Sequence, residues 1–268
     1  MEKQLFKGIK VMRTFVFVLS LMIVPLQAIS GEVRLGVLRT PDAMFENLKD
    51  FDFEPNYMNI QGLRIHYLDE GPEDGQPIFL LHGQPTWGYL FRHMITPLAD
   101  AGYRVIVPDM AGFGRSDKPK KKEDYSYPKH IQIMSELVER LELSDAVFFG
   151  QDWGGLVGLR VVAEMPDRFS HIIVSNTGLI SAEGIRAHIG YPLLKLAVWW
   201  EGEMTFEEMI ERANFRSWIA YAYYDKNLAV GKLMRAMGRI DDEQIIEGYE
   251  APFPSSAYKA GAQIFPYL

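Results

Sequence analysis

The sequence predicts an α/β fold, with a mostly parallel sheet, helices on both faces and a helical cap. Short apolar runs, which predict strands, alternate with amphipathic stretches such as residues 89–101 and 128–142, which predict helices. The runs are GLRIHYLDEG, QPIFLLHG, YRVIVPDM, DAVFFG and HIIVSNTG. Two glycine-containing motifs, HGQPTW and GQDWGG, directly follow such strands. Reactive groups of parallel sheets collect at these strand ends.

The sequence pattern changes between residues 182 and 250. No apolar strand run occurs there, and charged and aromatic residues recur at helical spacing. The motif YEAPFP then ends the helical pattern, because proline cannot continue a helix. We therefore predict a core at residues 31–181, a helical cap at residues 182–250 and a return to the core at residues 251–268.

The N-terminus has the order of a secretory signal: basic residues, the apolar run FVFVLSLMIVPL and then small residues. The basic residues are Lys3, Lys7, Lys10 and Arg13. We expect residues 1–30 to be a signal peptide, the protein to be periplasmic or secreted, and the mature form to have no stable membrane span. An uncleaved anchor stays open, as does a cytoplasmic protein that starts downstream, for example at Met12.

Composition excludes several classes of function. The chain has 268 residues, of which 48% are hydrophobic and 24% charged, as in ordinary globular proteins. A net charge of −7 argues against a nucleic-acid partner. The absence of cysteine removes disulfides, thiol catalysis and thiolate metal sites, and we expect neither a metal nor a cofactor. A short run of lysines predicts a solvated loop: Lys118, Lys120, Lys121 and Lys122.

The motif GQDWGG places Asp152 at the turn between a strand and a helix. Flanking glycines let its side chain project and bring backbone N–H groups close, and the helix dipole stabilises an anion there. A carboxylate that attacks a saturated carbon forms an ester that water can cleave, whereas serine would leave an ether. Asp152 therefore predicts a nucleophile that displaces a halide or an epoxide oxygen. A structural helix cap is the alternative.

The motif HGQPTW supplies a second part of this site. The backbone N–H of Gln84, together with that of Trp153, would form an oxyanion hole for ester hydrolysis. His82 at the end of its strand is interpreted as structural and not as a base. A third motif, PDMAGFGRSD, lacks the G-x-G-x-x-G pattern of phosphate loops, so Gly112 and Gly114 predict a tight structural loop.

Together these motifs resemble the haloalkane dehalogenases of the α/β-hydrolase fold, and most of all the branch typified by the Xanthobacter dichloroethane-degrading enzyme. The likeness runs from residue 39 to residue 268 and is interrupted mainly in the cap. The matching segments, in order, are YLDEG, LHGQPTWGYLFRHMI, PDMAGFGRSDKP, EDYSY, QDWGGLVGL and YEAPFPSSAYKAGAQIFP. One departure is Gln84, where the branch often has Glu, but the backbone donor is kept.

The resemblance implies that Asp152 attacks a small halogenated organic substrate and is alkylated. Trp153 and Trp218 would donate indole N–H groups to the leaving halide, with Trp199 and Trp200 as substitutes for Trp218. The residues that would line the substrate pocket are Phe215, Phe265 and Pro266. The reaction would convert a haloalkane and water into an alcohol, a halide ion and a proton.

The resemblance also implies a catalytic base and acid that this sequence does not contain. Ester hydrolysis needs a histidine base oriented by a carboxylate, and in this fold the histidine comes last. None of the histidines follows the cap, and Asn176 stands where some relatives place the acid. The histidines are His66, His82, His93, His130, His171 and His188. We therefore expect a C-terminally truncated fragment, without acid or base and unable to turn over.

Three alternatives stay open. An epoxide hydrolase would need cap tyrosines, for which the sequence offers Tyr221, Tyr223 and Tyr224. A haloacetate dehalogenase would need an arginine for the substrate carboxylate, and Arg216 is the candidate. A binding module of the same fold without catalysis is an alternative of another class.

Overall fold

The computed structural model describes residues 31–178 and 185–268, which belong to one compact unit. The predicted signal peptide at residues 1–30 and the predicted boundary between residues 181 and 182 lie outside the described residues. No helix in the described part combines the length and the apolar character that a membrane crossing requires.

A six-stranded sheet forms the core, in the order β3-β4-β6-β5-β8-β9. Strands β6, β5, β8 and β9 run parallel, and β4 joins β3 and β6 in antiparallel pairs. The bounds are β3 (Asn56–Ile60), β4 (Leu63–Glu70), β5 (Pro77–Leu81), β6 (Arg104–Pro108), β8 (Ala146–Gln151) and β9 (Phe169–Ser175). All five predicted strands are confirmed. Strand β3 was not predicted, because its residues are mostly half-buried and carry no apolar run.

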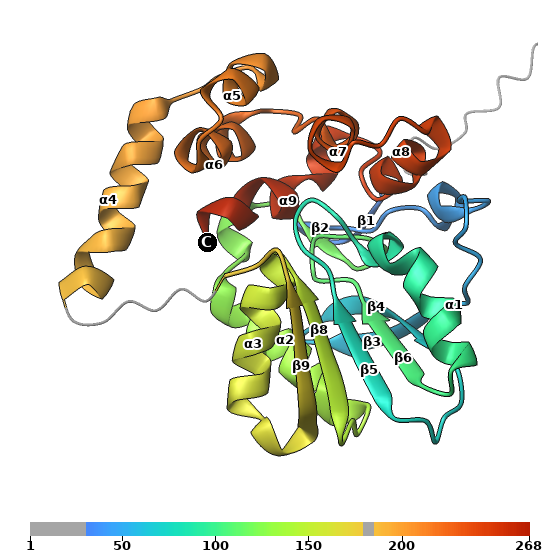
Figure 1. The fold of residues 1–268 in the computed structure, drawn as a ribbon. Helices are drawn as coiled ribbons and strands as arrows, with labels where there is room; N and C mark the ends of the chain where they lie inside the picture. Colours follow the sequence, from blue (N-terminus) through green and yellow to red (C-terminus); the bar gives the residue numbers. More distant parts are fainter. Residues whose placement is uncertain (1–30, 179–184) are drawn as a thin grey trace, which may run out of the picture. The chain divides into compact units, whose positions relative to one another are not determined.

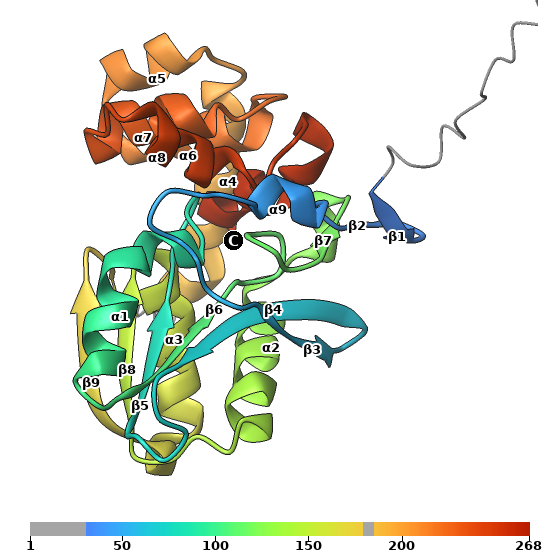
Figure 2. The ribbon, with the colours of Figure 1, turned by 90° about the vertical axis from the view of Figure 1, so that its right-hand side faces the viewer.

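The predicted helices cover both faces of the sheet. Helix α1 (Arg92–Asp100) and helix α2 (Tyr127–Arg140) lie on opposite sides, and α3 (Trp153–Glu164) packs against α2 (Figures 1 and 2). Ser126 begins α2 because its side chain accepts the N–H of Lys129, which satisfies a donor that the first helical turn leaves free. The fold is therefore the predicted α/β fold.

Burial is greatest in the central strands β5 and β6; in β5, Phe79, Leu80 and Leu81 are inaccessible to solvent. A continuous apolar run is what a strand covered on both faces requires. The outer strand β9 differs, because Ile172, Ile173 and Val174 are each about half exposed. The loop that carries HGQPTW thus follows one of the best-buried strands, whereas β8, which precedes the elbow, alternates buried and half-buried residues.

A small second sheet pairs β1 (Glu32–Arg34) with β2 (Val37–Leu38) and β2 with β7 (Lys118–Pro119). The predicted solvated loop is wrong for Lys118, which is fully buried and donates to the carbonyls of Gly114 (2.6 Å) and Ser116 (2.9 Å). Burial lowers the pKa of Lys118 to about 7, although nearby carboxylates oppose the shift. The physical reason is the pairing of β7 with β2, which turns this lysine inward.

The rest of the run behaves differently. Lys120 and Lys121 are exposed, as predicted, whereas Lys122 is half-buried and donates to the carbonyl of Tyr223 in the cap.

The described part of the cap region consists of helices joined by short loops and contains no strand (Figure 1). Its helices are α4 (Ile185–Glu201), α5 (Phe206–Arg212), α6 (Phe215–Tyr224), α7 (Val230–Gly238) and α8 (Glu243–Glu250). Local capping explains three of the starts: Thr205 forms a capping box with Glu208, Asn214 caps α6 and Asp242 caps α8. After α8 the chain forms the buried helix α9 (Ala260–Ile264), which contacts β7 and α6.

A close approach of α3 to β8 fixes the elbow between them. A Cβ at Gly158 would lie 2.1 Å from the ring of Phe148, which is closer than any real contact. We expect Gly158→Ala to lower the free energy of unfolding by about 1–3 kcal/mol, because the added methyl overpacks this interface.

The matched control is Gly190→Ala in α4, where a Cβ would meet nothing within 4 Å. This change should leave stability unchanged or raise it by up to about 1 kcal/mol, because alanine favours helix. Urea unfolding followed by tryptophan fluorescence measures both variants. Equal effects of the two substitutions would contradict the proposed packing constraint.

Candidate active site

Asp152 occupies a strained turn between β8 and α3, with φ 54° and ψ −125°. Its glycine neighbours allow the turn to close against the sheet. A Cβ at Gly154 would lie 2.0 Å from the carbonyl oxygen of Leu81, and one at Gly150 would lie 2.7 Å from the Cα of Gly155. Non-glycine residues seldom adopt a positive φ, and such strain is typical of functional sites.

The Asp152 carboxylate is held by backbone donors. The N–H of Gln84 donates to Oδ1 at 2.9 Å. Burial raises the pKa of the Asp152 carboxyl, and hydrogen bonds from the N–H groups of Gln84 and Trp153 oppose this shift. No described cation forms an ion pair with Asp152. Its side chain also makes none of the capping bonds expected of a structural helix cap.

The residues around this carboxylate are fixed from three sides. The side-chain amide of Gln84 donates to the carbonyl of Ala262 in α9 at 2.7 Å. The hydroxyl of Thr177 donates to the backbone carbonyl of Asp152 at 2.6 Å. The elbow after β8, the loop after β5, the segment after β9 and helix α9 therefore meet at one point.

His82 is structural, as interpreted from the sequence. Its Nε2 accepts the N–H of Met110 at 3.0 Å, so the ring proton is on Nδ1, which donates to the carbonyl of Gly83 at 2.8 Å. Burial lowers the pKa of His82, although Asp109 and the Gly83 carbonyl favour the charged form. With both nitrogens engaged, His82 cannot accept a proton from an attacking water molecule.

The other described histidines do not serve Asp152 either. His66 bonds to Asp109, and His93 and His171 lie at exposed positions. His130 is buried against the ring of Phe265, and burial lowers its pKa to about 3. The side chain of His188 lies outside the described residues. The part of the chain that the structure describes also contains no cluster of side chains suited to a metal ion.

A cavity of about 630 Å³ opens beside Asp152. Of the predicted site residues, it brings together Asp152, Trp153, Phe215 and Pro266. The sequence analysis did not find the other lining residues: Leu156, Thr177, Gly178, Gly190, Tyr191, Leu194, Tyr267 and Leu268, with Asn176 known only as the position of the absent acid. Tyr191 and Leu194 are three residues apart on α4, a helical spacing that points to one shared face.

Two predicted pocket residues lie elsewhere. Phe265 is fully buried and packs edge-on against the Trp153 indole, with 5.4 Å between ring centroids, so it supports that indole from behind. Trp218 is half-buried, stands 6.4 Å from the ring of Tyr221 and is not among the residues that line the cavity. Trp199 and Trp200, the substitutes for Trp218, are largely exposed on α4.

Comparison with known proteins agrees with this geometry. A family model described as the alpha/beta hydrolase fold matches residues 76–214. A haloalkane dehalogenase of Mycolicibacterium paratuberculosis is 44% identical over 241 residues, which are 87% of this chain and 71% of the relative. One of Psychrobacter cryohalolentis is 41% identical with the same coverage. The chain belongs to the haloalkane dehalogenases.

A solved structure supports the same assignment. The haloalkane dehalogenase DpaA from Paraglaciecola agarilytica NO2 aligns with a TM-score of 0.69 and 36% identity, over 86% of this chain and 70% of that one. Members of this family are hydrolases that act on carbon–halide bonds. In this dehalogenase the resemblance inferred from the motifs is therefore confirmed at the level of family and fold.

The partial burial of the Asp152 carboxylate leads to a prediction about stability. Burial raises the pKa of Asp152 above its ordinary value of 3.8, so the ionised form costs stability at any pH above the folded-state pKa. Below about pH 3.8 the carboxyl is protonated in both states and the cost disappears. We expect Asp152→Asn to unfold at a higher Tm than the wild type at about pH 7, by a few degrees.

The difference in Tm between Asp152→Asn and the wild type should shrink as the pH is lowered toward about 4. Thermal unfolding over this pH range measures it. Asp145→Asn, at an exposed position directly before β8, is the matched control and should show no such rise in Tm. An advantage of Asp152→Asn that does not change with pH would contradict the assigned cause.

Proposed function

We propose that Asp152 displaces halide from a haloalkane and is alkylated in the process. The observation that carries this proposal is a half-buried carboxylate, held by backbone N–H groups and not by a cation, at the wall of a mainly apolar cavity. Loss of solvation makes an anion more reactive, and the fixed N–H groups orient it without neutralising it. A neutral, weakly polar substrate fits the remaining space.

Halide displacement exchanges one bond at the substrate carbon for another. A carboxylate oxygen of Asp152 forms a bond to the carbon that carries the halogen, and the carbon–halogen bond breaks. The halide leaves with the bonding electron pair, and the negative charge of the carboxylate is transferred to it. Trp153 lines the same cavity, and its indole N–H is the proposed donor to the departing halide. Such a bond forms only as charge develops, so it lowers the barrier.

The second step is addition of water to the ester carbonyl of Asp152. The oxyanion that forms would lie against the N–H groups of Gln84 and Trp153, which already hold the free carboxylate. Collapse of the intermediate releases the alcohol and restores the carboxylate. Removal of the water proton requires a base, and no described histidine contacts Asp152. We therefore propose alkylation without sustained turnover for the 268-residue chain.

The alternative substrates find less support. The tyrosines considered for an epoxide hydrolase do not line the cavity, and the hydroxyl of Tyr221 accepts the N–H of Ala229. Arg216, considered for a haloacetate dehalogenase, lies close to Glu201 at 3.8 Å and is largely exposed. No specific observation favours either reaction.

Alkylation is directly measurable. Incubation with 1-bromobutane should add the mass of one butyl group per chain and release one bromide ion, because the ester persists without a base. Intact-mass spectrometry and peptide mapping should place the adduct on Asp152. Asp152→Ala should take up none, whereas Asp145→Ala should react like the wild type. Adducts spread over several carboxylates, or steady bromide release, would contradict the proposal.

The proposed halide donor has its own test. Trp153→Phe keeps the ring and the backbone N–H but removes the indole N–H. A hydrogen bond to a charged group is worth about 1.5–3 kcal/mol, so alkylation should slow by about tenfold or more. Trp200→Phe, at an exposed position on α4, is the control and should leave the rate unchanged.

The same assay decides the role of Trp218, the second proposed donor. Because Trp218 does not line the cavity, we expect Trp218→Phe to slow alkylation less than Trp153→Phe does. Equal slowing would show that α6 brings this indole to the halide when substrate is bound.

A further inference from the structure

The loop that carries Gln84 is bound by a carboxylate that has no place in the proposed chemistry. Asp109 follows β6 and is fully buried. Its Oδ1 accepts the N–H of Gly88 at 2.8 Å, and its Oδ2 accepts the N–H of Arg115 at 2.8 Å and lies 2.7 Å from Nδ1 of His66. One carboxylate thus joins the end of the loop at residues 83–88 to the loop after β6 and to strand β4.

His82 makes a reciprocal connection at the other end of that loop. Its Nε2 accepts the N–H of Met110, the residue after Asp109. Side chains from each loop therefore accept backbone N–H groups of the other, at His82 and Gly88 on one side and at Asp109 and Met110 on the other. Gln84 lies between these two attachments, and its N–H donates to Asp152.

The backbone packs closely around the Asp109 carboxylate at two glycines. A Cβ at Gly114 would lie 1.9 Å from Oδ2 of Asp109, and one at Gly88 would lie 3.1 Å from Oδ1. Gly114 also has a φ of +46°, which favours glycine. Gly114 of PDMAGFGRSD, interpreted as structural, therefore lets the backbone close around a carboxylate, whereas a Cβ at Gly112 would meet Tyr125 instead.

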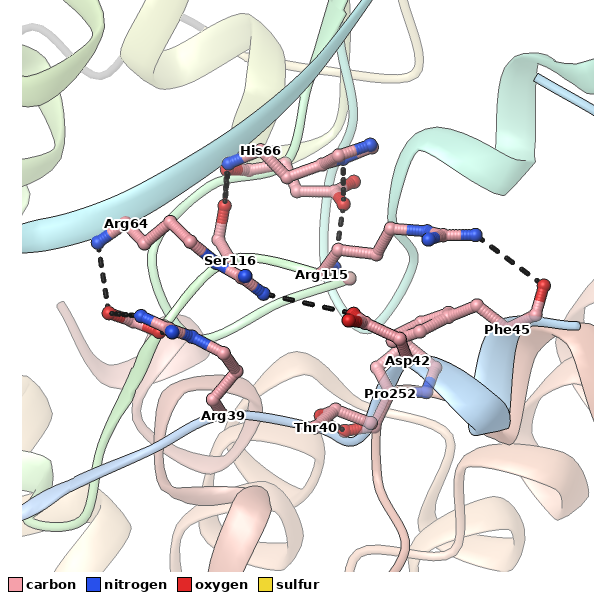
Figure 3. A network of polar contacts seen from close by, with 12 residues as sticks. Arg39, Thr40, Asp42, Phe45, Arg64, His66, Arg115, Ser116 and Pro252 are labelled. Atoms are coloured by element: carbon pink, nitrogen blue, oxygen red, sulfur yellow. Dashed lines mark hydrogen bonds and ion pairs between the residues drawn. The ribbon is translucent and has the colours of Figure 1, made fainter. Parts of the chain in front are cut away.

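Asp109 is the charged centre of a larger network, part of which Figure 3 shows around His66, Ser116 and Arg115. Burial alone would favour the neutral acid, but His66 and the hydrogen bonds outweigh it and hold the pKa of Asp109 at about 2. Nε2 of His66 is buried and has no hydrogen-bond partner within the described part of the chain. The carboxylate thus stays ionised and keeps its full capacity to accept three hydrogen bonds.

We propose that Asp109 is a positioning residue, which holds the loop at residues 83–88 so that the N–H of Gln84 points at the Asp152 carboxylate. This inference rests on the proposed function of Asp152 and adds the residue that fixes its oxyanion donor. Asp109 does not touch the reacting atoms, and it acts through Gly88 and the loop. An oxyanion donor works only at a fixed place and direction, and a displacement of about 1 Å costs about 10²-fold in rate.

The decisive variant is Asp109→Asn. An amide has one acceptor oxygen in place of two, so either Gly88 or Arg115 loses its acceptor and faces an NH₂ donor instead. The matched control is Asp117→Asn in the same loop. Asp117 is equally buried, but its hydrogen bonds go to Arg39 (2.8 Å and 3.0 Å) and to the N–H of Arg64 (2.9 Å), and none reaches the loop at residues 83–88. Gly88→Ala is a milder second variant, which keeps every charge.

The first measurement is amide hydrogen exchange of the peptide that covers residues 82–88. It does not depend on any reaction at Asp152. Asp109→Asn and Gly88→Ala should speed exchange in this peptide by about tenfold, while Asp117→Asn leaves it unchanged. Unchanged exchange in both loop variants, or equal acceleration in Asp117→Asn, would overturn the inference.

The second measurement separates positioning from general stability. After alkylation by 1-bromobutane, hydroxylamine attacks the Asp152 ester carbonyl, forms a hydroxamate and releases butanol, without need of a protein base. Asp109→Asn should leave the extent of alkylation unchanged and slow hydroxylamine cleavage by about tenfold, because the oxyanion loses its aligned donor. Asp117→Asn should cleave like the wild type. Equal cleavage rates in all variants would overturn the inference.

If the wild type takes up no butyl group, the proposed function fails, and the exchange measurement alone decides whether Asp109 holds the loop. If Asp109→Asn does not fold, Gly88→Ala supplies both measurements.

Discussion

The hydrogen bond from the Gln84 N–H to the Asp152 carboxylate is the contact on which the site depends. It joins the loop after β5 to the elbow after β8, and these strands are adjacent and parallel in the sheet. Neighbouring groups hold this contact in place. Glycines let the elbow close, His82 and Asp109 hold the loop, and the carbonyl of Ala262 accepts a hydrogen bond from the Gln84 side chain. The carboxylate can thus be partly removed from solvent and reactive without a cation beside it.

This arrangement concentrates unfavourable features at one residue. Asp152 has a strained backbone, a partly buried charge and a raised pKa, and each of these lowers the stability of the folded state. The surroundings compensate through close packing, as where α3 meets β8 at Gly158 and Phe148. Such a division, with strain at the reacting group and dense packing beneath it, is what a preorganised site requires.

The sequence predicted the architecture well because alternating apolar and amphipathic runs are local signals. It found the elbow, the loop after β5 and the structural role of His82. It missed β3, whose residues are only half-buried, and it misplaced Lys118, because the pairing that turns this lysine inward joins segments far apart in the chain. For the same reason it could not show that Phe265 supports the Trp153 indole from behind, or that Tyr191 and Tyr267 reach the cavity.

The sequence by itself determined the family, the fold and the chemistry of the elbow, because these depend on residue types at fixed short spacings. Only the tertiary structure decided which groups face Asp152. It placed the Gln84 N–H against the carboxylate, engaged both nitrogens of His82, and revealed Asp109 beneath the loop. Partners separated by 21 to 68 residues leave no pattern in a single sequence, because a hydrogen bond depends on distance and direction in space.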